Sequence, residues 1–346
     1  KLPHIMGKAF LFIFISLIIL FLFHSVFFII NLYFWMVDGY QVIFHGGTLI
    51  ESLYYSIYLK WMLLFDALWI TSILTYAFKR KHYKTNPELH YLKIKLKEKP
   101  NVCIIIPTFN EEESIKKILD GFFSQEIVKN IIVVDNNSSD NTVNIAKELG
   151  AIIIKKKKNT GGNTDSCMMG FKESLKTESN IMALVDADET YSPYDLDKMI
   201  PYLNNCDMVV GTRQVQTLTE KGNQNSMFYV WGNFLLAKLV QLKYFSLLHL
   251  GVVQLTDVGC SYRCIRKEAL EKIIEELSNP KDSFVLEPKN WIFSLYMTML
   301  AIENDLKIVE IPITFRKRHG ESKSEVTKKS KGIIYGLKFL WFILKR

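Results

Sequence analysis

The chain has 346 residues, a formal net charge of +8 and a hydrophobic fraction of 49%. This length suits one large domain with an appendage, or two domains. The basic balance favours nucleic acid, a membrane surface or an anionic substrate as partner. We disfavour nucleic acid, because the lysines lie largely in separate clusters beside apolar segments and no helix-turn-helix, zinc-finger or aromatic-basic sheet motif is present.

The cysteines do not predict a metal site or a disulfide framework. There are five, and they lack Cys-x-x-Cys spacing. Cys260 and Cys264 could share a helix face, but no histidines accompany them at metal-ligand spacing. We therefore expect buried free thiols in a reducing compartment.

Two apolar segments near the start of the chain predict membrane-spanning helices within residues 1–80. Lys8 to Val37 is nearly continuous Phe, Leu, Ile and Val, and about 20 apolar residues suffice to cross a bilayer. Trp61 to Phe78 is the second predicted span, with an interfacial helix as the alternative. Asp66 within it is costly in lipid, so it should face the other helix, Lys60 or interfacial water.

The charges that flank these segments predict their orientation. Four basic residues follow the second span, namely Lys79, Arg80, Lys81 and Lys84. The positive-inside rule then places the amino terminus and everything after Phe78 in the cytoplasm. Residues 81–100 form a charged linker before the next domain. We expect a multi-pass integral membrane protein with its catalytic domain on the cytoplasmic face.

From residue 101 onward, short apolar runs alternate with amphipathic stretches. This alternation predicts an α/β fold with a mostly parallel sheet and helices on both faces. The predicted strands are Val102 to Ile106, Ile131 to Asp135, Ala151 to Ile154, Met182 to Val185 and Met208 to Gly211. The predicted helices are Glu112 to Ser124, Asn141 to Leu149, Thr164 to Leu175 and Leu196 to Leu203.

Asp186-Ala187-Asp188 directly follows the fourth predicted strand. Side chains two apart on an extended strand point the same way, so the two carboxylates could converge at the carboxyl end of the sheet. Paired carboxylates beside a phosphate are how proteins hold Mg²⁺ or Mn²⁺ against a nucleotide. Taken alone, such a pair is also typical of a helix cap or a solvated loop.

The other predicted strand ends carry polar or glycine-rich residues too. Each has an alternative reading as ordinary loop chemistry, because Asn, Gly, Asp and Ser favour turns. Five such ends in register favour one ligand site. The four segments besides the Asp pair are Pro107 to Glu113, Asp135 to Asp140, Asn159 to Asn163 and Gly211 to Arg213.

The runs IIIPTFNEEESI, IIVVDNNSSDNT, VDADETY and VVGTR, in this order, resemble the family 2 glycosyltransferases with the GT-A (Rossmann-like) fold. The ending EIPITFRKRHGESKSE is similar to that of the polyprenyl-phosphate glycosyltransferases, which include dolichol-phosphate mannose synthase. The resemblance covers residues 101–325. It implies an inverting transfer of a sugar from a nucleotide-sugar donor to polyprenyl or dolichyl phosphate.

The resemblance also implies roles for individual residues. Asp135 would read the nucleobase, with Asn137 in the same loop, and Pro107, Thr108 and Glu111 would line the nucleoside pocket. Asp186 would lie beside the ribose and the diphosphate, and Asp188 would be the more direct ligand of the metal. The residues that would engage phosphates are Arg213, Arg318, Ser322 and Lys323. For Arg318 and Lys323, the alternative is a solvated basic tail that faces lipid headgroups.

The acceptor side leaves two readings open. Asp257, in Thr256-Asp257-Val258-Gly259-Cys260, would orient the acceptor or act as a base, or it caps a helix. A lipid phosphate is already ionised near neutral pH and needs little base catalysis. A sugar hydroxyl would need a carboxylate base, for which Asp257 and Glu287 are the candidates.

Three departures from the mannose synthases favour a UDP-sugar, with GDP-mannose as the alternative. Thr190 stands where those synthases carry a metal-binding glutamine. Asn163 stands near a lysine of many relatives, and residues 223–243 lack the arginine that contacts the acceptor phosphate.

Two further segments predict contact with a membrane surface. Residues 223–255 are rich in Trp, Phe, Tyr and Leu with lysines interspersed, and residues 326–346 end in a basic amphipathic stretch. Both predict interfacial helices, with core packing as the alternative. The whole sequence therefore predicts a membrane-anchored glycosyltransferase. The alternatives are a transferase that acts on a hydroxyl of a lipid or glycan, and a non-catalytic membrane protein that binds sugar nucleotides. The oligomeric state stays open.

Overall fold

A computed structural model describes residues 2–46, 57–79, 99–223, 226–246, 253–287, 289–318 and 329–346. The chain forms two compact units: Lys1–Lys81 together with Trp341–Arg346, and His82–Leu340. Most of the predicted linker, together with Ser322 and Lys323, lies outside the described residues.

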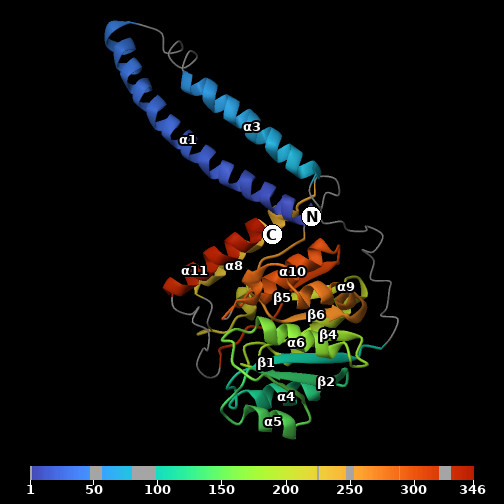
Figure 1. Ribbon diagram of the computed structural model, residues 1–346. Helices are drawn as coiled ribbons and strands as arrows, with labels where there is room; N and C mark the ends of the chain where they lie inside the picture. Colours follow the sequence, from blue (N-terminus) through green and yellow to red (C-terminus); the bar gives the residue numbers. More distant parts are fainter. Residues whose placement is uncertain are drawn as a thin grey trace. The chain divides into compact units, whose positions relative to one another are not determined.

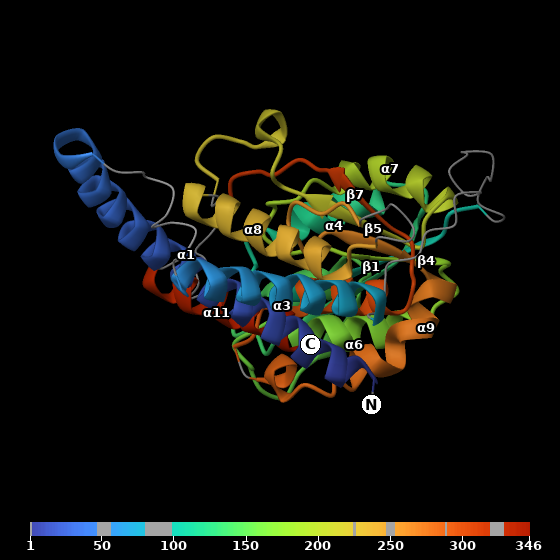
Figure 2. The same ribbon diagram turned by 90° about the horizontal axis from the view of Figure 1, so that it is seen from above.

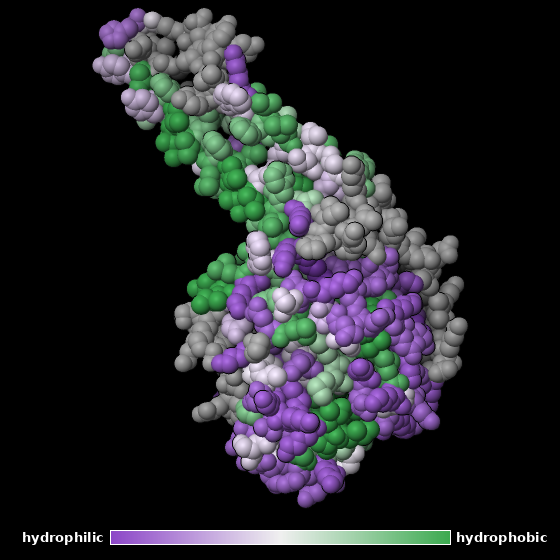
Figure 3. All heavy atoms as spheres, in the orientation of Figure 1, coloured by the Kyte–Doolittle hydropathy of each residue, from purple (hydrophilic) through white to green (hydrophobic). Residues whose placement is uncertain are grey.

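The first unit contains two long apolar helices, α1 (Leu2–His45) and α3 (Ile57–Lys79). Within them, Lys8–Phe34 and Lys60–Phe78 are long and apolar enough to cross a membrane, judged by length and composition. Their apolar side chains face outward, and Figure 3 shows the hydrophobic residues along them. Hydroxyl groups within these helices bond back one turn, as when Ser25 Oγ donates to the Phe21 carbonyl at 2.8 Å.

One polar contact joins α1 to α3 inside this apolar hairpin. His24 Nε2 lies 3.3 Å from Asp66 Oδ2, while His24 Nδ1 lies 2.8 Å from the Leu20 carbonyl oxygen. Asp66 therefore faces the other helix, which is the first of the three environments predicted for it. An ionisable group in an apolar helix is tolerated when it has such a partner.

The second unit is built on a seven-stranded sheet of order β3-β2-β1-β4-β6-β5-β7 (Figure 1). All neighbouring strands are parallel except β6, which runs antiparallel to β4 and β5. The strands are β1 (Val102–Thr108), β2 (Val128–Asp135), β3 (Ile152–Lys155), β4 (Ile181–Leu184), β5 (Met208–Thr212), β6 (Arg263–Arg266) and β7 (Ile308–Pro312). The prediction of a mostly parallel α/β sheet is confirmed, and the five predicted strands correspond to β1 to β5.

The strand directions bring several loops to one edge. The carboxyl ends of β1, β2, β4, β5 and β7 share this edge, because these strands are parallel in the sheet. Since β6 is antiparallel, the chain enters β6 from the same edge, and Arg263 pairs with Leu184. Sequence analysis missed β6 and β7, so it did not predict that the segments before β6 and after β7 meet the Asp186 loop.

Helices cover both faces of the sheet (Figure 1, Figure 2). On one face, α4 (Ile115–Phe123), α5 (Thr142–Glu148) and α7 (Leu196–Met199) pack over Ile104 and Ile106. On the other, α6 (Thr164–Ser174) packs beside α9 (Lys267–Ser278), which contacts α10 (Phe293–Glu303). Helix α6 approaches the sheet closely at Gly170, where a Cβ would lie 2.3 Å from Ile105 Cγ2.

The helix predicted at Leu196 to Leu203 is interrupted. It consists of the short 3₁₀ turns Pro193–Asp195 and Ile200–Asn204 around α7. Pro201 has no N–H to donate to the preceding turn, so the α-helical ladder cannot pass through it. The five cysteines are buried and free as predicted. Burial raises the pKa of the Cys103, Cys206 and Cys260 thiols to about 12, which makes them inert.

Two further helices match the segments predicted at a membrane surface, α8 (Met227–Tyr244) and α11 (Lys329–Lys345). On α8, Met227, Trp231 and Leu235 lie on one outward face and are 71%, 55% and 63% exposed. On α11, Ile334 and Leu337 are 54% and 59% exposed. Both helices therefore present apolar side chains to the outside, which core packing alone does not explain.

Candidate active site

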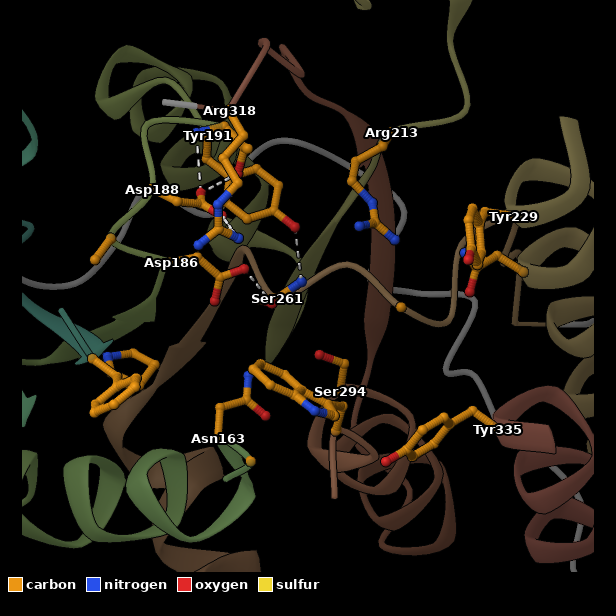
Figure 4. A pocket seen from close by; sticks show the side chains of 18 of the residues that line it. Asn163, Asp186, Asp188, Tyr191, Arg213, Tyr229, Ser261, Ser294, Arg318 and Tyr335 are labelled. Carbon is orange, nitrogen blue, oxygen red and sulfur yellow. Dashed lines mark hydrogen bonds and ion pairs between the residues drawn. The ribbon is translucent and has the colours of Figure 1, made fainter. Parts of the chain in front are cut away.

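A cavity of about 400 Å³ opens at the carboxyl edge of the sheet. Its walls come from the loops that follow β1, β2, β3, β4, β5 and β7, from the segment that leads into β6, from the start of α10, and from helices α8 and α11. Figure 4 shows acidic and basic side chains on one side of this cavity and tyrosines of α8 and α11 at its far end. The cavity therefore combines a charged part with a part lined by two helices.

Asp186 and Asp188 lie together in this cavity, as their spacing predicted. Ser261 Oγ donates to Asp186 Oδ2 at 2.9 Å, and Thr190 donates to Asp188 Oδ1 through its N–H at 3.1 Å and its hydroxyl at 2.5 Å. Burial and, next, the neighbouring charge of Asp188 raise the pKa of Asp186 to about 6. The pair is thus under electrostatic strain that a bound cation would relieve.

Arg318 supplies positive charge to this acidic cluster. Its Nη1 lies 2.9 Å from Asp188 Oδ2, and its Nη2 donates to Glu111 Oε1 at 2.7 Å. The Nε of Arg318 is buried and has no hydrogen-bond partner among the described residues. The guanidinium therefore bridges two carboxylates and still has a donor to offer to an anion.

The cluster fits a divalent cation that is shared with a diphosphate. Among the described residues, no three His, Cys, Asp or Glu side chains converge to form a cation site made by protein alone. Mg²⁺ and similar hard cations commonly bind through one or two carboxylates, with phosphate oxygens and waters completing the shell. Asp186 and Asp188 supply such a pair. The Thr190 hydroxyl orients Asp188 where the mannose synthases carry their glutamine.

Arg213 and Asp257 form a buried, two-pronged ion pair. Arg213 Nε and Nη2 donate to the two oxygens of Asp257 at 2.7 and 2.8 Å, and the Gly259 N–H donates to Asp257 Oδ1 at 3.0 Å. Burial by itself raises the pKa of Asp257, but Arg213 outweighs it and holds that pKa below the usual range. The Arg213 guanidinium also lies 5.4 Å from the centre of the Phe315 ring.

This geometry bears on the roles predicted for Asp257. Its carboxylate is fully buried, is engaged on both oxygens and does not line the cavity, whereas Arg213 does. A base needs a free oxygen near the proton that it takes. Asp257 is instead placed to position Arg213. Glu287, the other candidate base, lies outside the cavity lining and is half exposed beside Lys338, 3.5 Å away.

The loops after β1 and β2 form the other side of the cavity. Pro107, Thr108 and Glu111 line it as predicted, and the buried Thr108 hydroxyl has no partner among the described residues. Asp135 is buried, and its carboxylate accepts the Ser138 N–H at 3.0 Å. Asp135 does not line the cavity, and neither does Asn137, which is exposed in the left-handed region with φ 66°.

Several lining residues were not identified from the sequence. Asn136 belongs to the same polar loop as Asp135, and this loop was the available signal for it. Ser261 precedes the unpredicted strand β6, and no pattern marked it. Further examples are Tyr191, Trp291 and Ser294.

Helices α8 and α11 contribute glycines to the cavity wall. Gly232 of α8 and Gly336 of α11 both line it, and a Cβ built at either would meet nothing within 4 Å. Neither glycine is therefore required by close packing within the described structure. Tyr335, between the lining glycines of α11, donates its hydroxyl to the Lys289 carbonyl at 3.1 Å. The result is open space beside two apolar helices.

Comparison with known proteins identifies the family. The profile of glycosyl transferase family 2 matches residues 103–286. The chain belongs to this family and is a glycosyltransferase, and the observed sheet is GT-A-like.

Three relatives are 28% to 29% identical to the chain over the aligned residues. It is 28% identical over 227 residues to the polyprenol monophosphomannose synthase of Mycolicibacterium smegmatis, which covers 64% of the chain and 79% of that protein. It is 28% identical to the undecaprenyl-phosphate mannosyltransferase of Micrococcus luteus, covering 64% of the chain and 86% of that protein. It is 29% identical to the UDP-N-acetylglucosamine–dolichyl-phosphate N-acetylglucosaminyltransferase of Methanococcus voltae, covering 61% and 84%.

The Arg213–Asp257 pair makes a stability prediction. Asp257→Ala leaves the buried guanidinium of Arg213 without its partner, which costs about 3–5 kcal/mol. We expect the thermal midpoint of the purified protein to fall by roughly 10 °C. The double variant Arg213→Met/Asp257→Ala removes the stranded charge and should recover at least half of this loss. A double variant as unstable as Asp257→Ala alone would contradict the proposed pairing energetics.

Proposed function

We propose that this chain is a membrane-anchored, inverting glycosyltransferase that moves a sugar from a nucleotide-sugar to polyprenyl phosphate. The observation that carries the proposal is the single cavity, which joins a charged cluster for a diphosphate to an open wall of two apolar helices. The names of the three relatives support the acceptor, because each contains a polyprenol, undecaprenyl phosphate or dolichyl phosphate. Their sugars differ, so they support no single donor.

The donor's nucleotide is placed at the loops after β1 and β2. Thr108, Glu111 and Asn136 line this side, whereas Asp135, which was predicted to read the base, does not. Asp135 then holds the turn through the Ser138 N–H. We favour a UDP-sugar, with GDP-mannose as the alternative, because Thr190 and Asn163 depart from the mannose synthases.

The diphosphate is placed beside Asp186 and Asp188. Mg²⁺ or Mn²⁺ held by Asp188, with Asp186 beside it, would neutralise the charge that develops on the leaving nucleoside diphosphate. Arg318 would turn from Asp188 to a phosphate oxygen, to which its free Nε can also donate. Arg213, fixed by Asp257, offers a second positive charge at the same cavity. Ser322 and Lys323 remain predicted phosphate contacts.

The acceptor chemistry follows from the carboxylates present. In the described part of the chain, the carboxylates that line the cavity are Glu111, Asp186 and Asp188, which already serve Arg318 and the diphosphate. A lipid phosphate, with a second pKa of about 6, is ionised near neutral pH and attacks without a base. This supports a phosphate acceptor over a lipid or glycan hydroxyl.

The membrane surface is assigned to helices α8 and α11. Their outward apolar faces suit the boundary between headgroups and acyl chains. The helices α1 and α3 are proposed as spans, and the basic residues after α3 support an active site on the cytoplasmic side.

A transfer assay tests the function. Full-length protein in detergent is incubated with Mn²⁺, with labelled UDP-glucose, UDP-N-acetylglucosamine or GDP-mannose, and with either polyprenyl phosphate or polyprenol. We expect an acid-labile glycolipid from at least one donor with polyprenyl phosphate only, and its loss when EDTA removes the metal. Asp188→Asn should lower the rate by at least about a hundredfold. Glu268→Gln, at an exposed carboxylate, is the matched control. No product with any donor, or equal use of polyprenol, would overturn the proposal.

Substitution of Gly232 and Gly336 tests whether the lipid acceptor reaches the cavity between α8 and α11. Gly232→Leu and Gly336→Leu add side chains at the cavity wall, where a Cβ at either position meets nothing within 4 Å, and leucine favours a helix over glycine. We expect KM for polyprenyl phosphate to rise at least about tenfold, which corresponds to about 1.4 kcal/mol, while the donor's affinity is unchanged. Gly39→Leu in α1, which also has nothing within 4 Å, is the control. Unchanged KM in both cavity variants would contradict this path.

A further inference from the structure

The side of the cavity across from Asp186 carries a polar group that the protein leaves unsatisfied. Asn163 is the N-cap residue of α6, where asparagine ordinarily accepts an N–H of the first turn through its side chain. Here the side chain makes no such bond, and its buried Oδ1 has no partner among the described residues. Figure 4 shows Asn163 directed into the cavity below Asp186. The Asn163 carboxamide therefore does not cap α6.

A second polar group and an aromatic ring lie on the same side. Ser294, in the first turn of α10, is 7% exposed and lines the cavity (Figure 4). Its carbonyl accepts from Arg263 Nη1 and from Thr298 Oγ1, each at 2.9 Å, whereas its hydroxyl has no bond within the described chain. Trp291, which directly precedes the N-cap residue Ile292 of α10, also lines the cavity. Amide, hydroxyl and indole are all uncharged.

These groups are held rigidly to one another. The Gly162 backbone lies against Asn290 so closely that a Cβ at Gly162 would be 2.3 Å from the Asn290 carbonyl oxygen. Thr164 Oγ1 donates to the same oxygen at 2.9 Å. The loop that carries Asn163 is therefore fastened to the segment that carries Trp291. A preformed arrangement of this kind loses little entropy when a ligand binds.

The chemistry of this arrangement indicates its ligand. A free carboxamide and a free hydroxyl can pair with neighbouring hydroxyl groups, and an aromatic ring offers an apolar face to a sugar ring. The nearby ammonium of Lys156 is already ion-paired with Asp165, so it is not offered to a ligand carboxylate. The guanidinium groups that line the cavity are paired with carboxylates, Arg213 with Asp257 and Arg318 with Glu111 and Asp188, and the free Nε of Arg318 is the donor assigned above to a phosphate oxygen.

We propose that Asn163, Ser294 and Trp291 form the subsite for the donor's sugar, which is an uncharged hexose read through its hydroxyl groups. This inference rests on the proposed function, since it assumes that the diphosphate lies at Asp186 and Asp188. The sugar then occupies the space between that pair and Asn163, where the acceptor phosphate can reach it from the side of α8 and α11. Asn163 and Ser294 thereby select the sugar without contributing to nucleotide binding.

Calorimetric titration of the full chain with Mn²⁺ separates the sugar's contribution from the nucleotide's. The probes are UDP and GDP, together with UDP-glucose, UDP-N-acetylglucosamine, UDP-glucuronate and GDP-mannose. For the donor that wild-type protein turns over, Asn163→Ala should raise Kd about tenfold, as expected when one polar contact to a ligand is lost. Kd for the matching nucleoside diphosphate should not change. Ser294→Ala should act in the same direction, and wild type should not turn over UDP-glucuronate.

Controls distinguish a sugar contact from a structural effect. Asn144→Ala, at an exposed asparagine of α5, should leave every Kd unchanged. If Asn163→Ala weakens the binding of the nucleoside diphosphate and of the nucleotide-sugar equally, or weakens neither, the subsite proposal is overturned while the proposed function stands. Turnover of UDP-glucuronate would also overturn it. If wild-type protein binds no nucleotide, the proposed function fails and the subsite fails with it.

Discussion

The described active site depends on two carboxylates, Asp186 and Asp188, that lie together at one edge of a sheet, with Glu111 joined to Asp188 through Arg318. Burial and, next, the neighbouring charge of Asp188 raise the pKa of Asp186, which records the cost of holding this pair away from water. Arg318 offsets it by bridging Glu111 and Asp188. We propose that this electrostatic strain gives the site its affinity for a cation and a diphosphate. A cation can replace Arg318 as the positive charge beside Asp188, and a diphosphate can then accept hydrogen bonds from Arg318.

The topology explains how chain segments so far apart reach this cluster. The antiparallel strand β6 returns the chain to the edge where the parallel strands end, which brings Ser261 to Asp186. Strand β7 then delivers Phe315 and Arg318 to the same edge. The pair of Arg213 and Asp257 links the β5 end to the segment before β6. The charged part of the cavity is thus formed by segments at the strand ends, while helices α8 and α11 form its apolar part.

Much of this could be predicted from the sequence, because strand ends have a local signature. An apolar run followed by Asp-Ala-Asp or by Pro-Thr-Phe-Asn predicts both a strand and a site, and the structure has both strands and brings both segments to the cavity. The role of Asp257 could not be read in this way, since it depends on the guanidinium of Arg213, which is 44 positions away. Strand β6 has only four residues with arginine at both ends, so its period of two is too short to recognise. The free carboxamide of Asn163 could not be predicted, because whether an asparagine before a helix makes a capping bond depends on its side-chain conformation.

The exchange of Arg318 for a metal is the central claim, and binding of Mn²⁺ to the ligand-free protein, followed by electron paramagnetic resonance, tests it most directly. If Arg318 competes with the metal for Asp188, Arg318→Gln should bind Mn²⁺ more tightly than wild type, by about tenfold for a competing contact of about 1.4 kcal/mol. Asp188→Asn should abolish this binding in either background. Equal or weaker Mn²⁺ binding by Arg318→Gln would contradict the account.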